Sequence, residues 1–556
     1  MSNPPGAEAP EPRPSSGLGR ASALLASGTL VSRLLGFLKA IVLAATIGQV
    51  GSAAGDAFAL GNQLPNNIYA LIAGGVLGAI LVPQIVRAGL HDDGGQRFIN
   101  KIVTLGTIVF IVIAVLATAA APLLVALYAS SGTRGFSAEG IALATAFAYW
   151  CLPQVLFYAL YSLLGEVLNA RKAFGPFTWA PVLNNVVAIA GLLVFSVIFG
   201  GYAENNTVEV WDPARIALLA GSATVGVAAQ ALVLALFWRR AGLGFRPDFH
   251  FRGVGLRRTG KAAGWVFGMI LVTQTAGIFQ SRIASQAAGE GASLFTLQNS
   301  WLIFMLPHSV IAVSIATAYF TRMSGHASTA NLAGVREDVT SSLRTIGLFI
   351  TFASVALVVV AFPFARVFEQ TGFDNVTAMA LVIIAFSIGL VPFSAVFVLQ
   401  RVFYALEDTR TPFLVETVKA GLFIAGALSC TLLPVEFVGV GIALVTTLAC
   451  LVQTILTFAL LRRRLGPIGG RLLLRRHLQY LSAAVVAGVV GVGILVSLGG
   501  LDPDGYAQAA RIPAIVAISA VGAGMAAVYF GVLLLIRNPD ASVALESAVR
   551  RLRRRR

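Results

Sequence analysis

The chain has 556 residues, of which 57% are hydrophobic and 12% are charged, and its mean hydropathy is +0.83. This composition excludes an ordinary water-soluble enzyme, because about a quarter of the residues in a typical soluble domain are charged. A net charge of +16 would suggest nucleic acid in a soluble protein. Here the basic residues lie in loops between apolar segments, so topology explains them and we expect no nucleic-acid partner.

Residues 1–20 are rich in Pro, Gly, Ala and Glu, and they lack the basic start and short apolar core of a signal peptide. This segment is predicted to be a disordered cytoplasmic tail. Apolar runs follow it, each long enough for the roughly 20 residues that cross a bilayer, so we predict an all-α polytopic membrane protein with about 14 transmembrane helices. The runs lie near 21–47, 57–86, 102–129, 139–168, 177–200, 214–238, 262–288, 294–321, 339–364, 377–403, 413–434, 437–461, 478–500 and 511–536.

The charge of the loops alternates along the chain. With a cytoplasmic tail at the start, the odd-numbered loops face outward and hold acidic residues, whereas the even-numbered loops hold Arg and Lys clusters at 239–261 and 462–476. Because basic residues concentrate on the cytoplasmic side, both termini of this plasma-membrane protein are expected there. Residues 241–261 are predicted to form a basic cytoplasmic loop. Residues 537–556 are predicted to form a basic tail that anchors to the membrane surface, with a specific lipid or partner site as the alternative.

The sequence contains no signal for catalysis. No polar stretch between the spans is long enough for a catalytic domain, and the HExxH, GxSxG and GxxxxGK(S/T) patterns are absent. Cys151, Cys430 and Cys450 lie in apolar stretches without the spacing of a metal or redox motif. We therefore expect neither an enzyme nor a bound cofactor or metal.

Short patterns recur about six helices apart. Ser32-Arg33 in the first span corresponds to Ser281-Arg282 in the seventh, and Leu152-Pro153 corresponds to Val391-Pro392. A parallel repeat of this kind predicts two six-helix lobes with the substrate path between them. The alternative is chance similarity between apolar helices. The predicted units are an N-lobe at 21–240, a C-lobe at 262–464 and two further helices within 465–536.

Two cations lie deep in the first span. Arg33 is close to its middle, and Lys39 is about two helical turns further along. A charge at the centre of a bilayer costs about 3 kcal/mol on insertion scales, so such residues usually face a hydrated cavity or an anion. Their spacing lets both side chains line one wide cavity. The alternative is a structural ion pair with Asp56 or another carboxylate.

The seventh span is unusually polar. Arg282 lies in its outer half together with Gln274, Gln280 and Gln286, and Asn299 continues this polar character at the start of the eighth span. An anionic headgroup surrounded by sugars would need this mixture of a fixed cation and amide groups.

Other polar positions within the spans have a structural interpretation. Glu416 and Lys419, at i and i+3, are interpreted as a local surface ion pair. His308 is interpreted as a packed histidine of the core.

Several motifs together resemble one family, the MurJ (MviN) lipid II flippases of the MOP exporter superfamily, in its actinobacterial type. The resemblance extends over roughly residues 20 to 540, and its first block is the most specific. The motifs are Ser32-Arg33-Leu34-Leu35-Gly36-Phe37, Gly55-Asp56-Ala57-Phe58, Leu64-Pro65-Asn66, Val82-Pro83, Gly165-Glu166-Val167-Leu168-Asn169-Ala170, Leu183-Asn184-Asn185, Phe304-Met305-Leu306-Pro307 and Phe403-Tyr404-Ala405-Leu406-Glu407-Asp408-Thr409-Arg410-Thr411-Pro412.

The resemblance implies a cationic central cavity between two lobes that alternate in access, with a groove for the lipid tail at 465–536. It also implies lipid II as the substrate, moved from the inner to the outer leaflet, with membrane lipids and cell-wall synthesis or division proteins as further partners. The substrate-binding residues expected from the resemblance and the charge pattern are Arg33, Lys39, Asp56, Arg282, Gln280 and Asn299.

The chain also departs from the family pattern. Two positions where the family has a cavity arginine are here about Tyr69 and Leu302, and Lys39 replaces an arginine. Lysine keeps the charge but loses the bidentate fork. Two alternatives therefore stay open: a flippase or exporter for another polyprenyl-linked glycan or a cation, and a scaffold of the cell-wall machinery that transports nothing.

Overall fold

The structure is a computed structural model, and it describes residues 16–73, 95–171, 173–240, 242–250 and 261–553. These residues form helices joined by short turns, with one isolated bridge between Ser131 and Phe136 and no extended strand among them. Most of the expected tail at 1–20, the end of the second span and much of the basic loop at 241–261 lie outside the described residues. So do the last three arginines of the chain.

The first helix group comprises α1 to α10. Within it α8 packs between α1 and α10, α2 packs against α6, and α7 packs against α4 and α10. The helices are α1 (Ser16–Ile47), α2 (Ala53–Ile72), α4 (Gln96–Ala119), α5 (Ala121–Tyr128), α6 (Ala138–Cys151), α7 (Gln154–Ala170), α8 (Phe174–Phe199), α9 (Tyr202–Asn205) and α10 (Pro213–Arg240).

The second helix group comprises α11 to α19. Within it α11 packs against α18, and α17 packs between α14 and α19. Its elements are α11 (Lys261–Ala284), η3 (Ser285–Ala287), α12 (Leu294–Pro307), η4 (His308–Ala312), α13 (Val313–Ser328), α14 (Leu332–Val359), α15 (Ala361–Phe368), α16 (Phe373–Ile388), α17 (Leu390–Ala405), α18 (Arg410–Ser429), η5 (Cys430–Leu432) and α19 (Val435–Leu465).

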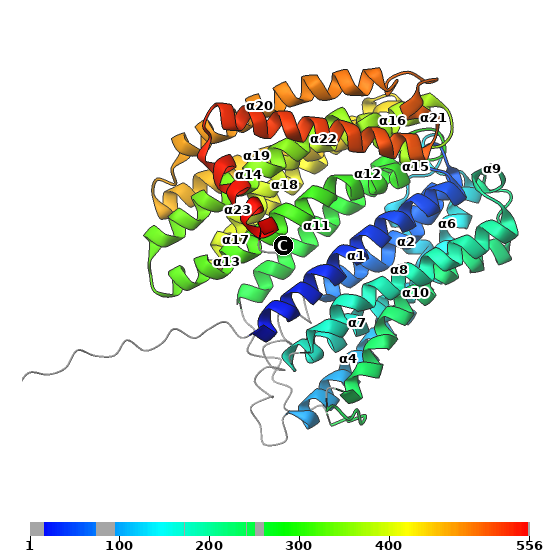
Figure 1. The fold of residues 1–556 in the computed structure, drawn as a ribbon. Helices are drawn as coiled ribbons and strands as arrows, with labels where there is room; N and C mark the ends of the chain where they lie inside the picture. The colour runs from blue at the N-terminus through cyan, green and yellow to red at the C-terminus, as the bar shows by residue number, and fades with distance from the viewer. Residues whose placement is uncertain (1–15, 74–94, 172, 241, 251–260, 554–556) are drawn as a thin grey trace, which may run out of the picture.

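The remaining helices are α20 (Gly470–Ser497), α21 (Tyr506–Ala509), α22 (Arg511–Leu535) and α23 (Pro539–Arg553). The two long ones, α20 and α22, pack against each other, and α20 also packs on α14 of the second group. Figure 1 shows the two helix groups converging at the end that carries α9 and α21, called here the narrow end. They separate toward the opposite, wide end (Figure 1).

The helix count agrees with the sequence. Within the described residues, eleven helical stretches are long and apolar enough to cross a membrane, and α16 with α17, bent by 41° to each other, would make a twelfth. The remaining two expected spans correspond to α2 and α11, whose amide and charged side chains lower their hydropathy. The predicted all-α polytopic class is therefore confirmed, with about 14 spans as an approximate number.

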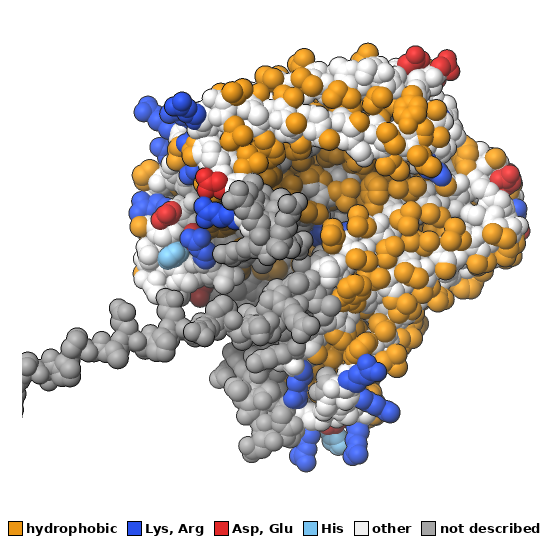
Figure 2. Space-filling model, viewed as in Figure 1, with side chains coloured by type: hydrophobic (Ala, Val, Ile, Leu, Met, Phe, Trp, Pro, Cys, Tyr) orange, Lys and Arg blue, Asp and Glu red, His pale blue; other side chains and the backbone are white. Residues whose placement is uncertain are grey.

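The surface matches an integral membrane protein. Figure 2 shows hydrophobic side chains along the flanks of the long helices and a hollow between the two groups. Most Lys and Arg side chains lie at the wide end, together with some acidic side chains, and further acidic side chains lie at the narrow end (Figure 2). This distribution agrees with the predicted alternation of loop charge.

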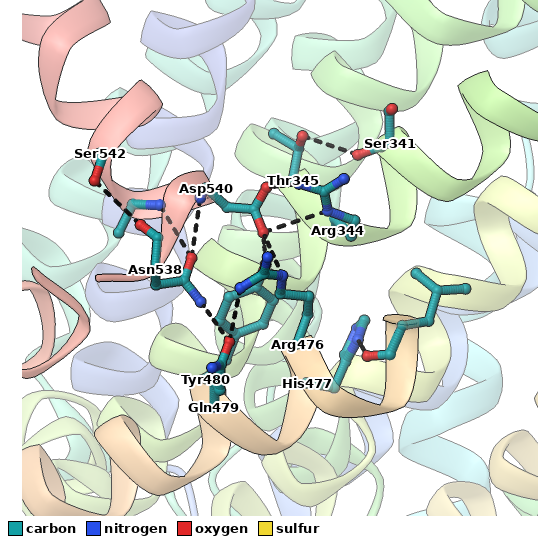
Figure 3. Close-up of polar contacts among 12 residues, drawn as sticks. Ser341, Arg344, Thr345, Arg476, His477, Gln479, Tyr480, Asn538, Asp540 and Ser542 are labelled. Carbon is teal, nitrogen blue, oxygen red and sulfur yellow. Dashed lines mark hydrogen bonds and ion pairs between the residues drawn. The ribbon is translucent and has the colours of Figure 1, made fainter. Parts of the chain in front are cut away.

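A polar cluster ties the C-terminal helices to the second group. Asp540, at the start of α23, forms an ion pair with Arg344 of α14 and accepts a hydrogen bond from the hydroxyl of Tyr480 in α20 at 2.7 Å (Figure 3). Arg476 Nε lies 3.6 Å from the same carboxylate. The side-chain amide of Asn538 donates to Gln479 Oε1 at 2.9 Å. One carboxylate thus joins three helices that are far apart in the sequence.

Candidate functional site

A cavity of about 370 Å³ lies between the two helix groups. Its polar wall consists of amide side chains from three helices, and its apolar wall consists of aromatic side chains from the second group. The amides belong to Gln63 and Asn67 of α2, Gln274 and Gln280 of α11 and Gln298 of α12. The aromatic side chains are Trp301, Phe386, Phe393 and Phe423.

The amides also hold α2 and α11 together across the two groups. Gln63 Nε2 donates to the hydroxyl of Ser281 at 2.8 Å, and Gln274 Nε2 donates to the carbonyl of Asn67 at 2.7 Å. This explains why two helices inside a membrane protein are polar, because each turns its polar face toward the other and toward the cavity. Gln280 is the one predicted substrate residue that lines this cavity.

Asp56 joins the two helix groups at the narrow end, where α2 meets the start of α12. Its side chain is 1% exposed, and its two oxygens accept the backbone N–H groups of Gly289 and Phe295, each at 3.1 Å. The alternative of an ion pair between Asp56 and Arg33 or Lys39 is wrong for this structure, because backbone donors occupy the carboxylate.

Asn299 and Arg282 form hydrogen bonds at the same narrow end. Asn299 Nδ2 donates to Gln49 Oε1 at 2.7 Å, and Arg282 Nη1 donates to the carbonyl of Ala126 at 2.9 Å. Arg282 therefore caps the C-terminal end of α5, and neither residue lines the central cavity in this conformation. Substrate binding by Asp56, Asn299 and Arg282 stays a prediction.

Sequence reasoning missed further contacts that close the narrow end. The backbone N–H of Val50 donates to Glu369 Oε2 at 2.9 Å, and Glu369 is 2% exposed. The backbone N–H of Ser130 donates to Ser285 Oγ at 2.7 Å. The only available signal for Glu369 was an acidic residue at the end of an apolar run, which cannot specify a partner more than 300 residues away.

Lys39 does not share the central cavity. It lines a separate polar pocket of about 60 Å³ inside the first helix group, together with Asn62, Gln154, Tyr158 and Asn184. No carboxylate lines this pocket, and no described residue forms a hydrogen bond or an ion pair with Lys39 Nζ. Arg33 is not among the residues that line this pocket, so the expectation that Arg33 and Lys39 line one cavity stays a prediction.

Arg33 and Arg401 instead both exert an electrostatic influence on His308. The imidazole of His308 is within electrostatic range of both guanidinium groups, and its Nδ1 lies 3.0 Å from Ser394 Oγ. Arg401 stacks on Phe397, with its guanidinium carbon 3.6 Å from the ring centroid. An arginine from each helix group thus adds positive charge to the surroundings of the same histidine. His308 is 2% exposed, as expected for a packed core histidine.

Arg401 is absent from the predicted substrate residues. The available signal was an arginine inside the apolar run at 377–403, which is as unusual as Arg33 in the first span. The positions of the missing family arginines carry no charge, since Tyr69 packs beside Tyr158 and Leu302 packs against the core. Arg401 is therefore a candidate replacement for the missing positive charge.

Glu416 and Lys419 form the expected ion pair, with Lys419 Nζ 2.8 Å from Glu416 Oε1. The pair lines the central cavity rather than the outer surface, so that part of the interpretation is wrong. Glu416 also accepts a hydrogen bond from Gln453 Nε2 at 2.7 Å. The carboxylate is thus fully engaged within the second group.

Comparisons with known proteins agree with this architecture. A family model described as "Lipid II flippase MurJ" matches residues 43–501. A probable lipid II flippase MurJ of Rhizobium meliloti is 27% identical over 546 residues, covering 95% of this chain and 96% of that protein. A second, of Rickettsia prowazekii, is 26% identical over 404 residues, covering 71% and 74%.

Solved structures show the same fold. A lipid II flippase MurJ in an inward closed conformation aligns with a TM-score of 0.69 and 18% identity, covering 92% of this chain and all of that one. An inward-facing multidrug resistance MATE transporter of the MOP superfamily aligns with a TM-score of 0.60 and 17% identity, covering 79% and 95%. Because the family model spans well over half of the sequence, the chain belongs to the lipid II flippase MurJ family.

Proposed function

We propose that this protein flips lipid II, the polyprenyl-diphosphate-linked precursor of peptidoglycan, from the cytoplasmic to the outer leaflet of the plasma membrane. A diphosphate and its sugars cannot cross about 30 Å of hydrocarbon unaided. The observation that carries the proposal is the amide-lined cavity between the two helix groups, whose wall residue Phe393 packs against His308, the histidine within electrostatic range of Arg33 and Arg401. The narrow end faces outward and the wide, basic end faces the cytoplasm, with both termini on that side.

The side chains divide into roles that fit such a headgroup. Arg33 and Arg401 attract the diphosphate, because guanidinium groups bind phosphate oxygens through paired hydrogen bonds. Gln63, Gln280 and Gln298 offer amide donors and acceptors to the sugars. The polyprenyl tail stays in lipid, and opening of the narrow end releases the headgroup on the other side.

A cation exporter of the same superfamily is less well supported. Export of a cation favours a free carboxylate in the cavity. Among the described lining residues Glu416 is the acidic one, and Lys419 and Gln453 already occupy it. A flippase for another polyprenyl-linked glycan would use the same residues, and the choice of cargo is part of the test.

The test is complementation of a flippase-depleted bacterium, with lipid II on the outer leaflet measured directly. We expect the wild-type protein to restore outer-leaflet lipid II, and Arg33→Ala and Arg401→Ala each to reduce it at least ten-fold. Arg239→Ala is the matched control, since Arg239 is an exposed basic residue at the end of α10, away from the cavity.

Failure of the well-expressed wild-type protein to restore outer-leaflet lipid II would contradict the proposed cargo and favour another polyprenyl-linked glycan. Full activity of both arginine variants would contradict the roles assigned to Arg33 and Arg401, because the headgroup would then cross without either guanidinium group. Equal loss in Arg239→Ala would show a general effect of charge removal, which also contradicts the assigned roles.

A further inference from the structure

A second hollow, of about 860 Å³, lies between α14, α17, α19 and α20. It is called here the C-terminal groove. Its walls are mainly apolar, and they include Leu399, Ile455, Phe458 and Leu474. Ile455 and Leu474 are 61% and 62% exposed, so the protein itself leaves this apolar surface uncovered. An apolar molecule must cover it in the membrane.

The groove is separate from the central cavity. On α17 the cavity is lined by Phe393, whereas the groove is lined by Pro392 and Ala395. On α19 the cavity is lined by Thr446, whereas the groove begins at Leu451. Two helices therefore form a wall between them, and an occupant of the groove lies outside the path between the helix groups.

One end of the groove is basic. Arg462 and Arg463, at the end of α19, are among its lining residues. No described carboxylate pairs with either arginine, whereas the next residue, Arg464, pairs with Asp408. Arg471, at the start of α20, is also exposed and forms no ion pair with a described residue. The rim therefore carries positive charge that the protein does not neutralise.

The dimensions fit one leaflet. From Leu451 to Arg462 the helix rises about 16 Å at 1.5 Å per residue. This is about half of the roughly 30 Å hydrocarbon core. A molecule with its charge at Arg462 and its apolar part along α19 would therefore reach about the middle of the membrane.

We infer that the C-terminal groove binds an anionic phospholipid of the leaflet at the wide end. Its acyl chain lies between α17, α19 and α20, and its phosphate lies at Arg462 and Arg463. Basic pockets between transmembrane helices bind anionic headgroups in this way. The lipid fills the seam between the C-terminal helices and the second group, where α20 makes its main protein contacts with α14 and α22. This inference does not depend on the proposed cargo.

The test compares two lipids with the same acyl chains, phosphatidylglycerol and phosphatidylcholine, bound to the full-length protein and measured by native mass spectrometry. We expect a preference for phosphatidylglycerol that falls about ten-fold in the double variant Arg462→Gln/Arg463→Gln. The matched control is Arg239→Gln/Arg240→Gln, which removes the same charge from the end of α10 and should keep the preference. No preference in the wild-type protein, or equal loss in the control, would overturn the inference.

A second variant tests the apolar part of the site. Ala459 lines the groove and is exposed, so Ala459→Trp fills the hollow without disturbing the packed core. We expect it to reduce tight binding of both lipids several-fold while the melting temperature stays unchanged. Undecaprenyl phosphate tests whether the groove binds a polyprenyl tail instead of a phospholipid. Displacement of phosphatidylglycerol by an equimolar amount of this carrier lipid would assign the groove to the polyprenyl tail and overturn the assignment to a phospholipid.

Discussion

Asp56 of α2 accepts the backbone N–H of Phe295, in the first turn of α12, at 3.1 Å across the two helix groups. The first N–H groups of a helix have no partner within the helix, and they carry a partial positive charge. A buried carboxylate therefore satisfies the start of α12 and joins the two groups at the narrow end. Opening of that end must break this contact.

Asp56→Asn is expected to open the narrow end more often. The variant keeps the shape of the side chain but loses its charge, and hydrogen bonds to a charged acceptor contribute about 1.5–3 kcal/mol each. The measurement is the labelling rate of a cysteine at Gln298 by a membrane-impermeant maleimide, with the three native cysteines replaced by alanine. The rate should rise several-fold. Glu290→Gln is the control, because Glu290 is exposed in the same loop region. An unchanged labelling rate in Asp56→Asn would show that the contact between Asp56 and Phe295 does not hold the narrow end closed.

Lys39→Met is expected to stabilise the fold. An ammonium group without a carboxylate partner in a small pocket of the first helix group destabilises the folded state, because burial removes its hydration. Methionine has a similar length without the charge. The melting temperature in detergent should rise by a few degrees. Arg239→Met, at an exposed position, should leave it unchanged. A lower melting temperature for Lys39→Met would mean that the ammonium has a stabilising partner.

Asp540→Asn should loosen the C-terminal helices. Arg344 and Tyr480 both bind this carboxylate, and removal of its charge leaves Arg344 and Arg476 without their shared partner. We expect a loss of about 1–3 kcal/mol, read as a lower melting temperature. Glu546→Gln is the control, because the Glu546–Arg550 pair is 65% and 78% exposed and such pairs contribute little. Equal effects of the two substitutions would refute a special role for Asp540.

The contacts of Asp408, between α17 and α18, are expected to stabilise the fold less at acid pH. Burial opposes its ionisation, but the backbone N–H and hydroxyl of Thr411 and the guanidinium of Arg464 outweigh burial, and the pKa of Asp408 lies below its ordinary value of 3.8. A lowered pKa in the folded state stabilises the protein above the unfolded pKa. This stability is lost as the pH falls below about 4 through the folded pKa.

The corresponding measurement is the melting temperature of wild type and Asp408→Asn between pH 7 and pH 3.5. The wild type should be more stable at pH 7, and the difference should shrink toward pH 3.5. Asp502→Asn, at an exposed loop position, should show no such pH-dependent difference. A difference that is constant with pH would contradict the assignment.

The sequence by itself determined the class of protein and its family. Apolar runs of spanning length, the alternation of loop charge and the blocks around Arg33 and Asp56 are local features, and the bilayer acts on each of them separately. For this reason the expected spans match α1 to α22 closely, although Pro153 and Pro307 lie at breaks within two of them. The roles proposed for individual residues and the limits of the lobes stay predictions.

Only the tertiary structure decided what each polar side chain touches. Arg33 and Lys39 are six residues apart on one helix, yet one acts electrostatically on His308 of the second group and the other enters a pocket of the first group. Arg282 caps α5 instead of lining the cavity. These contacts depend on the rotation of each helix about its axis and on which helices cross, and hydropathy along the chain carries no information about either.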